Sequence, residues 1–258
     1  MIRSVSALLG SCALSMALVA CSSSQMPKGP PRAVIDRALK SAPGAAQPST
    51  IVAAELAFAR AARERGQWTA FRQFAAPGAL VHGPDGPLAV DAWLAGKADP
   101  AAAVQRQPRV VAVSCDGALA VGKGRYRDPQ GRVGSFVTVW ERQPSGDYRY
   151  IFDASGDDVP QPPPPPQQQV EEGDIVVTEM DAVTGLVASC PRKDTTVPAP
   201  PAIPIGEDGK ADARLSRDGT LRWRWEQSAN GTRSIVADYF YEGRWLNAIE
   251  QSLVLTGE

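Results

Sequence analysis

The chain has 258 residues, 43% of them apolar, and a formal net charge of −1 at neutral pH. This length suits one large or two small globular domains. The balanced charge provides no basic field for a phosphate backbone, so we expect no nucleic-acid partner. One histidine and four cysteines, two of them in the N-terminal targeting segment, cannot assemble a Cys/His zinc cluster, and we expect neither a metal nor a cofactor.

Residues 1–20 have the pattern of a bacterial signal peptide. Arg3 supplies the positive charge, and the apolar run from Ala7 to Ala20 is too short to span a bilayer. The run ends in Leu-Val-Ala followed by Cys21, which resembles the cleavage motif of bacterial lipoproteins. The resemblance implies that residues 1–20 are removed and that Cys21 is acylated, which would anchor the protein in a lipid bilayer. The alternative is an ordinary secretory signal in which Cys21 has no special role.

The residues after Cys21 indicate which membrane holds the anchor. Ser22 stands where lipoproteins retained in the inner membrane carry Asp, so the resemblance favours the outer membrane, with the protein facing the periplasm. Residues 21–48 are rich in Ser, Pro, Gly and Ala, which predicts a flexible tether between the anchor and the folded part.

Residues 49–158 are predicted to form the first domain, which begins with helices. Ser49 or Thr50 can cap a helix over 51–65, and Gly66 would end it. The predicted apolar face holds Ile51, Ala54, Phe58 and Ala61, and the other faces hold Glu55, Arg63 and Glu64. Shorter helices are predicted over 68–74, which carries Trp68, and over 90–95, which carries Trp93, with a short strand at 80–81 between them.

The sequence pattern then changes to a period of two residues, which is typical of β-strands. Strands are predicted over 109–115 and 118–126, joined at Asp116 and Gly117, a pair typical of a type I′ turn. The runs 136–140 and 148–152 form a predicted hairpin that is apolar on both faces and therefore central in its sheet. Helices followed by a four-stranded antiparallel meander predict an α+β fold with the helices on one face of the sheet.

This order of elements resembles the SnoaL-like branch of the nuclear transport factor two superfamily. The resemblance is carried by the LVHGPDG strand, the DAWL helix, the DG hairpin and the stretch GSFVTVWERQPSGDYRYIFD, and it covers about 110 residues. It implies a cystatin-like cone, in which a curved antiparallel sheet wraps around the helices and small molecules bind at the mouth. Related cones often dimerise through their sheets, so the resemblance also suggests a homodimer.

The family includes isomerases, cyclases and dehydratases that use a carboxylate base beside an oxyanion donor in an apolar pocket. The resemblance makes Asp153 the candidate base and Tyr126 or His82 its partner. Pocket candidates are Trp68, Trp93 and Phe136. Each polar candidate also has another explanation: His82 as a solvent-facing loop residue, and Tyr126 as a packed ring with its hydroxyl in water. For Asp153, the resemblance places an acid at this position in non-enzymes too.

No second acid can be placed near Asp153 from the sequence, so we favour a non-catalytic module over an isomerase, cyclase or dehydratase of the SnoaL kind. Such a module would bind a small apolar ligand or an envelope protein. A structural role in an outer-membrane assembly is a third hypothesis, which an exposed apolar face on the C-terminal part would support.

The C-terminal part consists of a proline-rich spacer over 159–172 and a β segment over 173–258. The spacer is predicted to adopt polyproline II. Short apolar runs occupy 175–179 and 186–190, and from Ala213 the alternation predicts an antiparallel meander of three or four strands. Its alternating Trp223 and Trp225 are predicted to face a buried side rather than to stack on sugars. We expect this sheet to pack on the first domain or on a partner.

Cys115 and Cys190 are the two thiols left after processing. In an oxidising periplasm they are predicted to form a disulfide, which would tie the segment beyond the spacer to the first domain. The alternative is a pair of buried free thiols.

Overall fold

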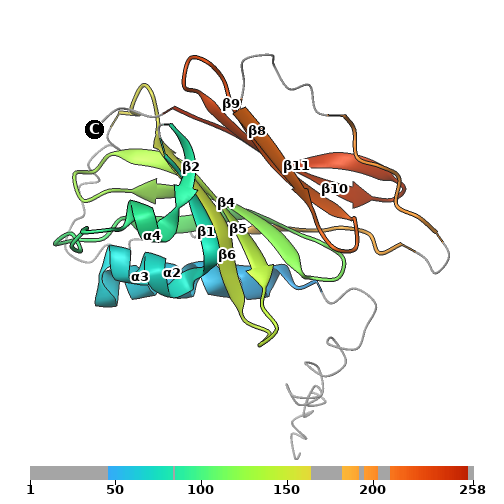
Figure 1. Ribbon diagram of the computed structural model, residues 1–258, viewed down its shortest axis with the longest axis horizontal. Coiled ribbons are helices and arrows are strands. Elements are labelled where there is room, and N and C mark those ends of the chain that lie inside the picture. Colours follow the sequence, from blue (N-terminus) through green and yellow to red (C-terminus); the bar gives the residue numbers. More distant parts are fainter. Residues whose placement is uncertain (1–45, 84, 164–181, 192–194, 203–209, 255–258) are drawn as a thin grey trace, which may run out of the picture. The chain divides into compact units, whose positions relative to one another are not determined.

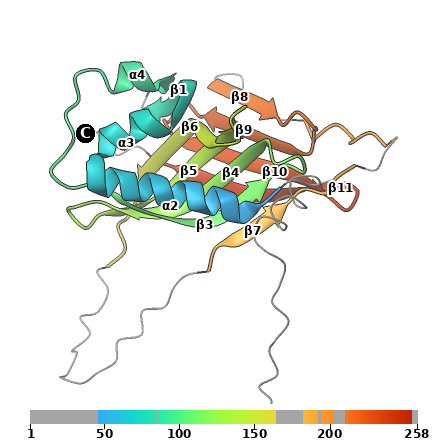
Figure 2. The same cartoon turned by 90° about the horizontal axis from the view of Figure 1, so that it is seen from below.

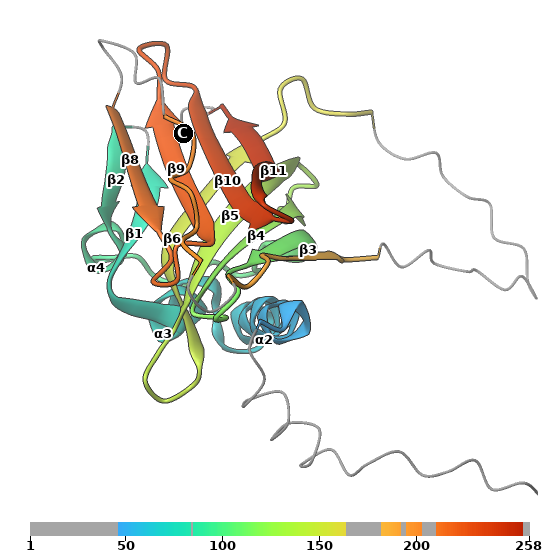
Figure 3. The ribbon, with the colours of Figure 1, turned by 90° about the vertical axis from the view of Figure 1, so that its right-hand side faces the viewer.

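Two sheets and a layer of helices make up the residues that the computed structural model describes, which are 46–83, 85–163, 182–191, 195–202 and 210–254. The helices cover one face of a seven-stranded sheet, and a four-stranded sheet packs against its other face (Figures 1 and 3). The α+β prediction is therefore confirmed. Both sheets belong to one compact unit, Leu39–Glu258.

The helices are α2 (Pro48–Arg65), α3 (Gln67–Phe74) and α4 (Val90–Trp93). The predicted cap of α2 is wrong, because the helix begins before Ser49 and Thr50 and both residues lie inside its first turn. Pro48 explains the earlier start. Proline has no N–H to donate, and the N–H groups in the first turn of a helix have no acceptor within the helix, so proline is favoured there. Gly66 ends α2 as predicted, with a φ of 109° and its N–H donating to Ala62 O at 3.2 Å.

The large sheet has the strand order β2-β1-β6-β5-β4-β3-β7. Its strands are β1 (Ala75–Gly83), β2 (Gly86–Ala89), β3 (Gln105–Val113), β4 (Leu119–Arg127), β5 (Val133–Arg142), β6 (Tyr148–Asp157) and β7 (Thr184–Val187). Strands β3 to β6 form the predicted meander, with β5 between β4 and β6.

The prediction of a purely antiparallel sheet is wrong, because β1 pairs with β6 and β7 pairs with β3 in parallel. The meander leaves β3 and β6 as open edges, and each edge is covered by a strand that is not its neighbour along the chain. Strand β7 comes from the predicted C-terminal segment, so that segment contributes to the large sheet.

The predicted type I′ turn between β3 and β4 is also wrong. A type I′ turn needs positive φ at both central residues, and only Gly117 has it, at 65°. The loop is instead closed by side chains: the hydroxyl of Ser114 donates to Asp116 Oδ1 at 2.6 Å, and the N–H of Leu119 donates to Ser114 Oγ at 3.1 Å.

The four-stranded sheet is an antiparallel meander, as predicted, with the order β11-β10-β9-β8. Its strands are β8 (Lys210–Leu215), β9 (Leu221–Gln227), β10 (Arg233–Tyr241) and β11 (Arg244–Leu253). Trp223 and Trp225 face the large sheet, and the rings of Trp223 and Phe152 lie 4.8 Å apart. Because these indoles are only 3% and 8% exposed, the prediction that they are core residues is confirmed.

A disulfide joins the β3–β4 loop to the chain just after β7, and the segment 195–202, here called the strap, contacts the small sheet. Cys115 and Cys190 are bonded, with their Cα atoms 5.1 Å apart, in agreement with the prediction. The strap lies on the outer side of the small sheet, where Trp245 Nε1 donates to Pro198 O at 2.9 Å and the guanidinium of Arg222 donates to Pro201 O. The C-terminal segment is thus packed onto the first domain.

Several predictions fall outside the described residues: the signal peptide with Cys21, the tether up to residue 45, most of the 159–172 spacer, and the apolar run 175–179. Within the described part, no helix has both the length and the apolar character needed to cross a membrane.

Candidate functional site

A cavity of about 200 Å³ lies between the helices and the large sheet. It is on the side of the sheet that carries the helices, whose arrangement Figure 2 shows. One wall is apolar and comes from the helices and the chain after α4. It consists of Phe58, Ala59, Ala62, Trp68, Phe71, Trp93 and Val104. The other wall is polar and comes mainly from the sheet. It consists of Arg106, Tyr126, Asp128, Arg132, Ser155 and Asp157, with Gln67 beside them.

The apolar wall is built from aromatic rings that hold one another in place. Trp68 and Phe71 are three residues apart on α3 and so lie on one face of it. Trp93 from α4 packs edge-on against both, with ring centroids 5.0 Å from Trp68 and 5.6 Å from Phe71. Asp99 fixes the start of α3 by accepting from Thr69 N at 3.0 Å and Thr69 Oγ1 at 2.6 Å.

Arg106 forms the floor of the cavity and is paired with Asp153 on β6. Their side chains are only 8% and 4% exposed, and Arg106 Nη2 donates to Asp153 Oδ2 at 2.7 Å. Thr138 on β5 completes the cluster, because its hydroxyl donates to Asp153 Oδ2 at 2.8 Å and accepts from Arg106 at 2.7 Å. The guanidinium carbon also lies 3.9 Å from the ring centroid of Phe136.

Glu55 is a second acid near this floor, and its predicted place on a polar face of the helix is wrong. The residue is 1% exposed, and its Oε1 accepts from Trp140 Nε1 at 2.8 Å. Its Oε2 has no hydrogen-bond partner among the described residues. Burial raises the pKa of Glu55 to about 7, although the charge of Arg106 acts in the opposite direction.

Tyr126 lies at the polar wall, where its hydroxyl donates to Asp157. Arg132 contacts the same carboxylate at 3.3 Å and Asp128 at 2.6 Å, so two carboxylates share one guanidinium at this wall. Burial, followed by the bond to Asp157, raises the pKa of Tyr126, so the phenol stays protonated at neutral pH. The hydroxyl that was expected to reach water thus has a protein partner, because it donates a hydrogen bond to Asp157.

His82 lies on the opposite face of the large sheet, between the two sheets. It is 5% exposed, and its ring centroid is 4.9 Å from that of Trp225 and 5.9 Å from that of Phe152. Its explanation as a solvent-facing loop residue is wrong, because the small sheet covers this end of β1. Burial, together with the charge of Arg233, lowers the pKa of His82 to about 4.

The structure thus brings some of the predicted residues together and separates others. Trp68, Trp93 and Tyr126 line the cavity, while Asp153 and Phe136 lie at its floor against Arg106. His82 cannot reach Asp153 from the other side of the sheet. The sequence interpretation missed Arg106 and Glu55. The spacing of Glu55, four residues after Ile51 and three before Phe58, was the available sign that it faces the core.

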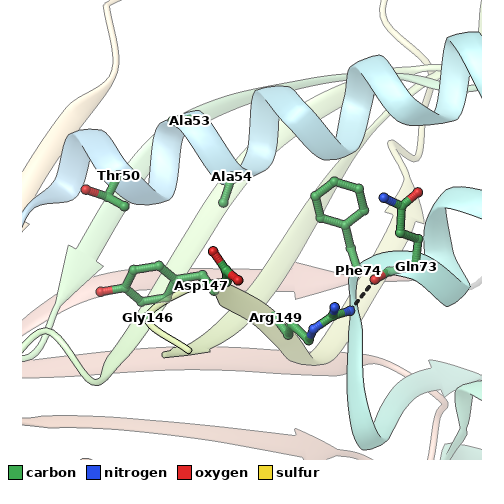
Figure 4. A pocket seen from close by; sticks show the side chains of 9 residues that line it. Thr50, Ala53, Ala54, Gln73, Phe74, Gly146, Asp147 and Arg149 are labelled. Carbon is green, nitrogen blue, oxygen red and sulfur yellow. Dashed lines mark hydrogen bonds between the residues drawn. The ribbon is translucent and has the colours of Figure 1, made fainter. Parts of the chain in front are cut away.

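A second hollow of about 410 Å³ lies between α2, the end of α3 and the β5–β6 hairpin (Figure 4). Figure 4 shows Thr50, Ala53 and Ala54 along α2, and Arg149 pointing toward Gln73, whose carbonyl it contacts. Although larger, this groove is more open, and its charged residues, Asp147 and Arg149, are exposed. The smaller cavity is the better candidate site, because it combines an aromatic wall with a buried charged pair.

No family model and no curated protein matches this chain. Its function therefore has to be inferred from the chemistry of the cavity. Within the described ranges, no three His, Cys, Asp or Glu side chains come together to hold a metal ion.

Asp153 is poorly placed to act as a base on a molecule in the cavity. Both of its oxygens accept hydrogen bonds from Arg106, one also accepts from Thr138, and the side chain lies behind the cavity lining. What the arrangement offers is an apolar wall for a ring and a polar wall that can orient it.

Proposed function

We propose that this protein is a non-catalytic lipoprotein of the bacterial outer membrane that binds a small, mostly apolar molecule in the cavity between α2, α3, α4 and the large sheet. The observation that carries the proposal is the pairing of an aromatic wall with a floor whose cation, Arg106, is already neutralised by Asp153. Such a site holds a ligand by apolar contact and offers no free base or nucleophile.

The alternative, a SnoaL-type isomerase, cyclase or dehydratase with Asp153 as base, has less support. Catalysis would require Asp153 to give up the hydrogen bonds from Arg106 and Thr138 before it could accept a proton. The proposed partner His82 lies on the other face of the sheet. The helix-covered meander that the resemblance implies supports a ligand-binding cone equally well without catalysis.

The ligand proposal is tested by isolating the protein from solubilised envelopes and identifying co-purified small molecules by mass spectrometry. Ala59→Phe would fill the cavity from α2, whereas Ala53→Phe on the same helix lines the open groove and serves as the control. We expect one compound with the unmodified protein and Ala53→Phe, and its loss with Ala59→Phe. The same compounds at the same yield from all three proteins would contradict ligand binding in this cavity.

The membrane proposal rests on the lipoprotein-like motif that ends at Cys21, outside the described residues. Cys21→Ala should remove acylation and move the protein from the outer-membrane fraction to the soluble periplasmic fraction. If the variant stays in the membrane fraction undiminished, the anchor assignment is wrong. The cavity proposal would stand in that case, because it depends only on the folded part.

A further inference from the structure

The charges around the cavity do not balance. At the floor, Arg106 is bonded to Asp153 through two nitrogens, at 2.7 and 3.3 Å, so this pair contributes no net charge. At the polar wall, Asp128 and Asp157 face the single guanidinium of Arg132. Among the described residues, the lining and the counter-ion Asp153 therefore carry an excess of one negative charge.

The negative charge of the polar wall is buried, whereas the positive charge that offsets it lies toward water. The side chains of Asp128 and Asp157 are only 7% and 13% exposed, but that of Arg132 is 58% exposed. Water screens an exposed charge more strongly than a buried one. The wall therefore presents a negative potential to the cavity, which attracts a cation and disfavours an anion.

Asp157 is the carboxylate that a cation in the cavity would meet. Asp128 is held by its own loop, because its Oδ1 accepts from the N–H groups of Gln130 and Arg132 at 3.0 and 2.8 Å and its Oδ2 accepts from Arg132 Nε at 2.6 Å. The contact of Arg132 with Asp157 is longer, at 3.3 Å, than the roughly 2.7–2.9 Å of a strong charged hydrogen bond. A charged N–H group on a ligand would add to this weak neutralisation.

The aromatic wall suits the same class of ligand. The face of an aromatic ring is negative, and tryptophan attracts cations more strongly than the other aromatic side chains. A cation of the protein already lies over two of these rings, with Lys97 Nζ 4.4 Å from the ring centroid of Trp93 and 5.4 Å from that of Trp68. Lys97 itself is exposed and is not part of the cavity lining.

We propose that the ligand is a small organic cation, such as an amine or an amidine. Its charged group donates to Asp157, and its apolar part packs on the rings of Trp68, Phe71 and Trp93. This inference rests on the proposed function and adds the charge class of the ligand to it.

Three planar molecules of nearly the same shape test the charge class: benzamidinium is a cation, benzamide is neutral and benzoate is an anion. Titration calorimetry on the purified full-length protein at pH 7 and low salt should give benzamidinium the lowest Kd, by about tenfold or more over the other two. Equal or tighter binding of benzamide or benzoate would overturn the inference and leave the binding proposal intact. Failure of all three to bind would count against the proposed function itself.

Asp157→Asn provides the second arm of the test, because it removes the negative charge but keeps an oxygen that can accept from Tyr126. We expect this variant to lose about tenfold in affinity for benzamidinium and to bind benzamide as before. Asp147→Asn removes an exposed carboxylate from the open groove and is the matched control, with unchanged binding of both molecules.

Unchanged binding of benzamidinium by folded Asp157→Asn, or an equal loss in the control, would overturn the assignment of Asp157 as the contact of the cation. If Asp157→Asn does not fold, the comparison of the three molecules on the unmodified protein still decides the charge class.

Discussion

A glutamate that faces the core makes the stability of this fold depend on pH. The pKa of Glu55 is about 7 in the folded protein, above its ordinary value of 4.5, so folding favours the protonated form. The stabilising contribution is complete below pH 4.5 and is lost as the pH rises through 7. The loss amounts to about 3 kcal/mol, from the difference between the two pKa values.

Glu55→Gln should remove this dependence, since glutamine stays neutral and keeps the oxygen that accepts from Trp140. We expect the variant to match the unmodified protein near pH 4 and to be more stable by about 3 kcal/mol at pH 8. Urea unfolding at both pH values measures the difference. Parallel pH profiles for the two proteins would mean that Glu55 is ionised in the fold.

The pKa of His82 shifts in the opposite direction, so its effect on stability has the opposite pH dependence. Its pKa of about 4 in the fold lies below the ordinary 6.5, so its contribution to stability is present above pH 6.5 and is lost as the pH falls through 4. His82→Phe keeps a ring beside Trp225 and removes the titration. Relative to this variant, the unmodified protein should lose about 3 kcal/mol between pH 6.5 and pH 4 in urea unfolding. A constant difference would indicate that His82 reaches water.

The burial of Glu55 and His82 could not have been predicted from residue type alone. Glu55 and His82 are polar residues that sequence patterns assign to the surface, and the structure buries both. For Glu55 the helical spacing contained the necessary sign. For His82 no neighbouring residue indicated burial, because the ring that packs on it belongs to Trp225, which is far away in the sequence.

At the level of elements, the β3–β6 meander and the C-terminal meander follow from alternation and turn residues, and both were predicted. The parallel pairing of β1 with β6 and of β7 with β3 was not predicted, because a strand pattern identifies strands but not their neighbours. The floor of the cavity depends on such a long-range arrangement: Arg106 is on β3, whereas Asp153 is on β6. Only the folded sheet brings them together.

Gly124 on β4 tests the packing beneath Arg106. A Cβ at this position would lie 2.4 Å from Phe136 Cζ and 2.2 Å from Gln107 O, so the ring that supports Arg106 and the neighbouring strand would both have to move. We expect Gly124→Ala to destabilise the fold by about 1–3 kcal/mol, measured by urea unfolding. Unchanged stability would show that β3, β4 and β5 are not this close.

At the scale of the molecule, the small sheet covers the face of the large sheet opposite the helices, so a second copy cannot pair through that face. The inter-sheet core includes Phe152, Trp223, Ile235 and Leu253, all of them buried. We therefore expect the protein produced without residues 1–21 to be a monomer in light scattering. A dimer would require an interface elsewhere and would contradict this argument.

The disulfide joins the loop after β3 to the chain after β7 across 75 residues. Replacing both Cys115 and Cys190 by serine should lower the free energy of unfolding by about 4 kcal/mol, because the unfolded chain gains the entropy of an open loop. Denaturant unfolding of the double variant measures this loss. Stability equal to that of the unmodified protein would mean that the bridge contributes nothing beyond the packing of the sheets.

We propose that the cavity between the aromatic wall and Arg106 binds a small, mostly apolar molecule. The most direct measurement is a crystal structure of the protein with benzamide, which has one apolar ring. We predict that benzamide lies in this cavity, with its ring against Trp93. Benzamide bound instead in the groove beside Thr50 and Arg149, or an unoccupied cavity at saturating benzamide, would contradict the claim.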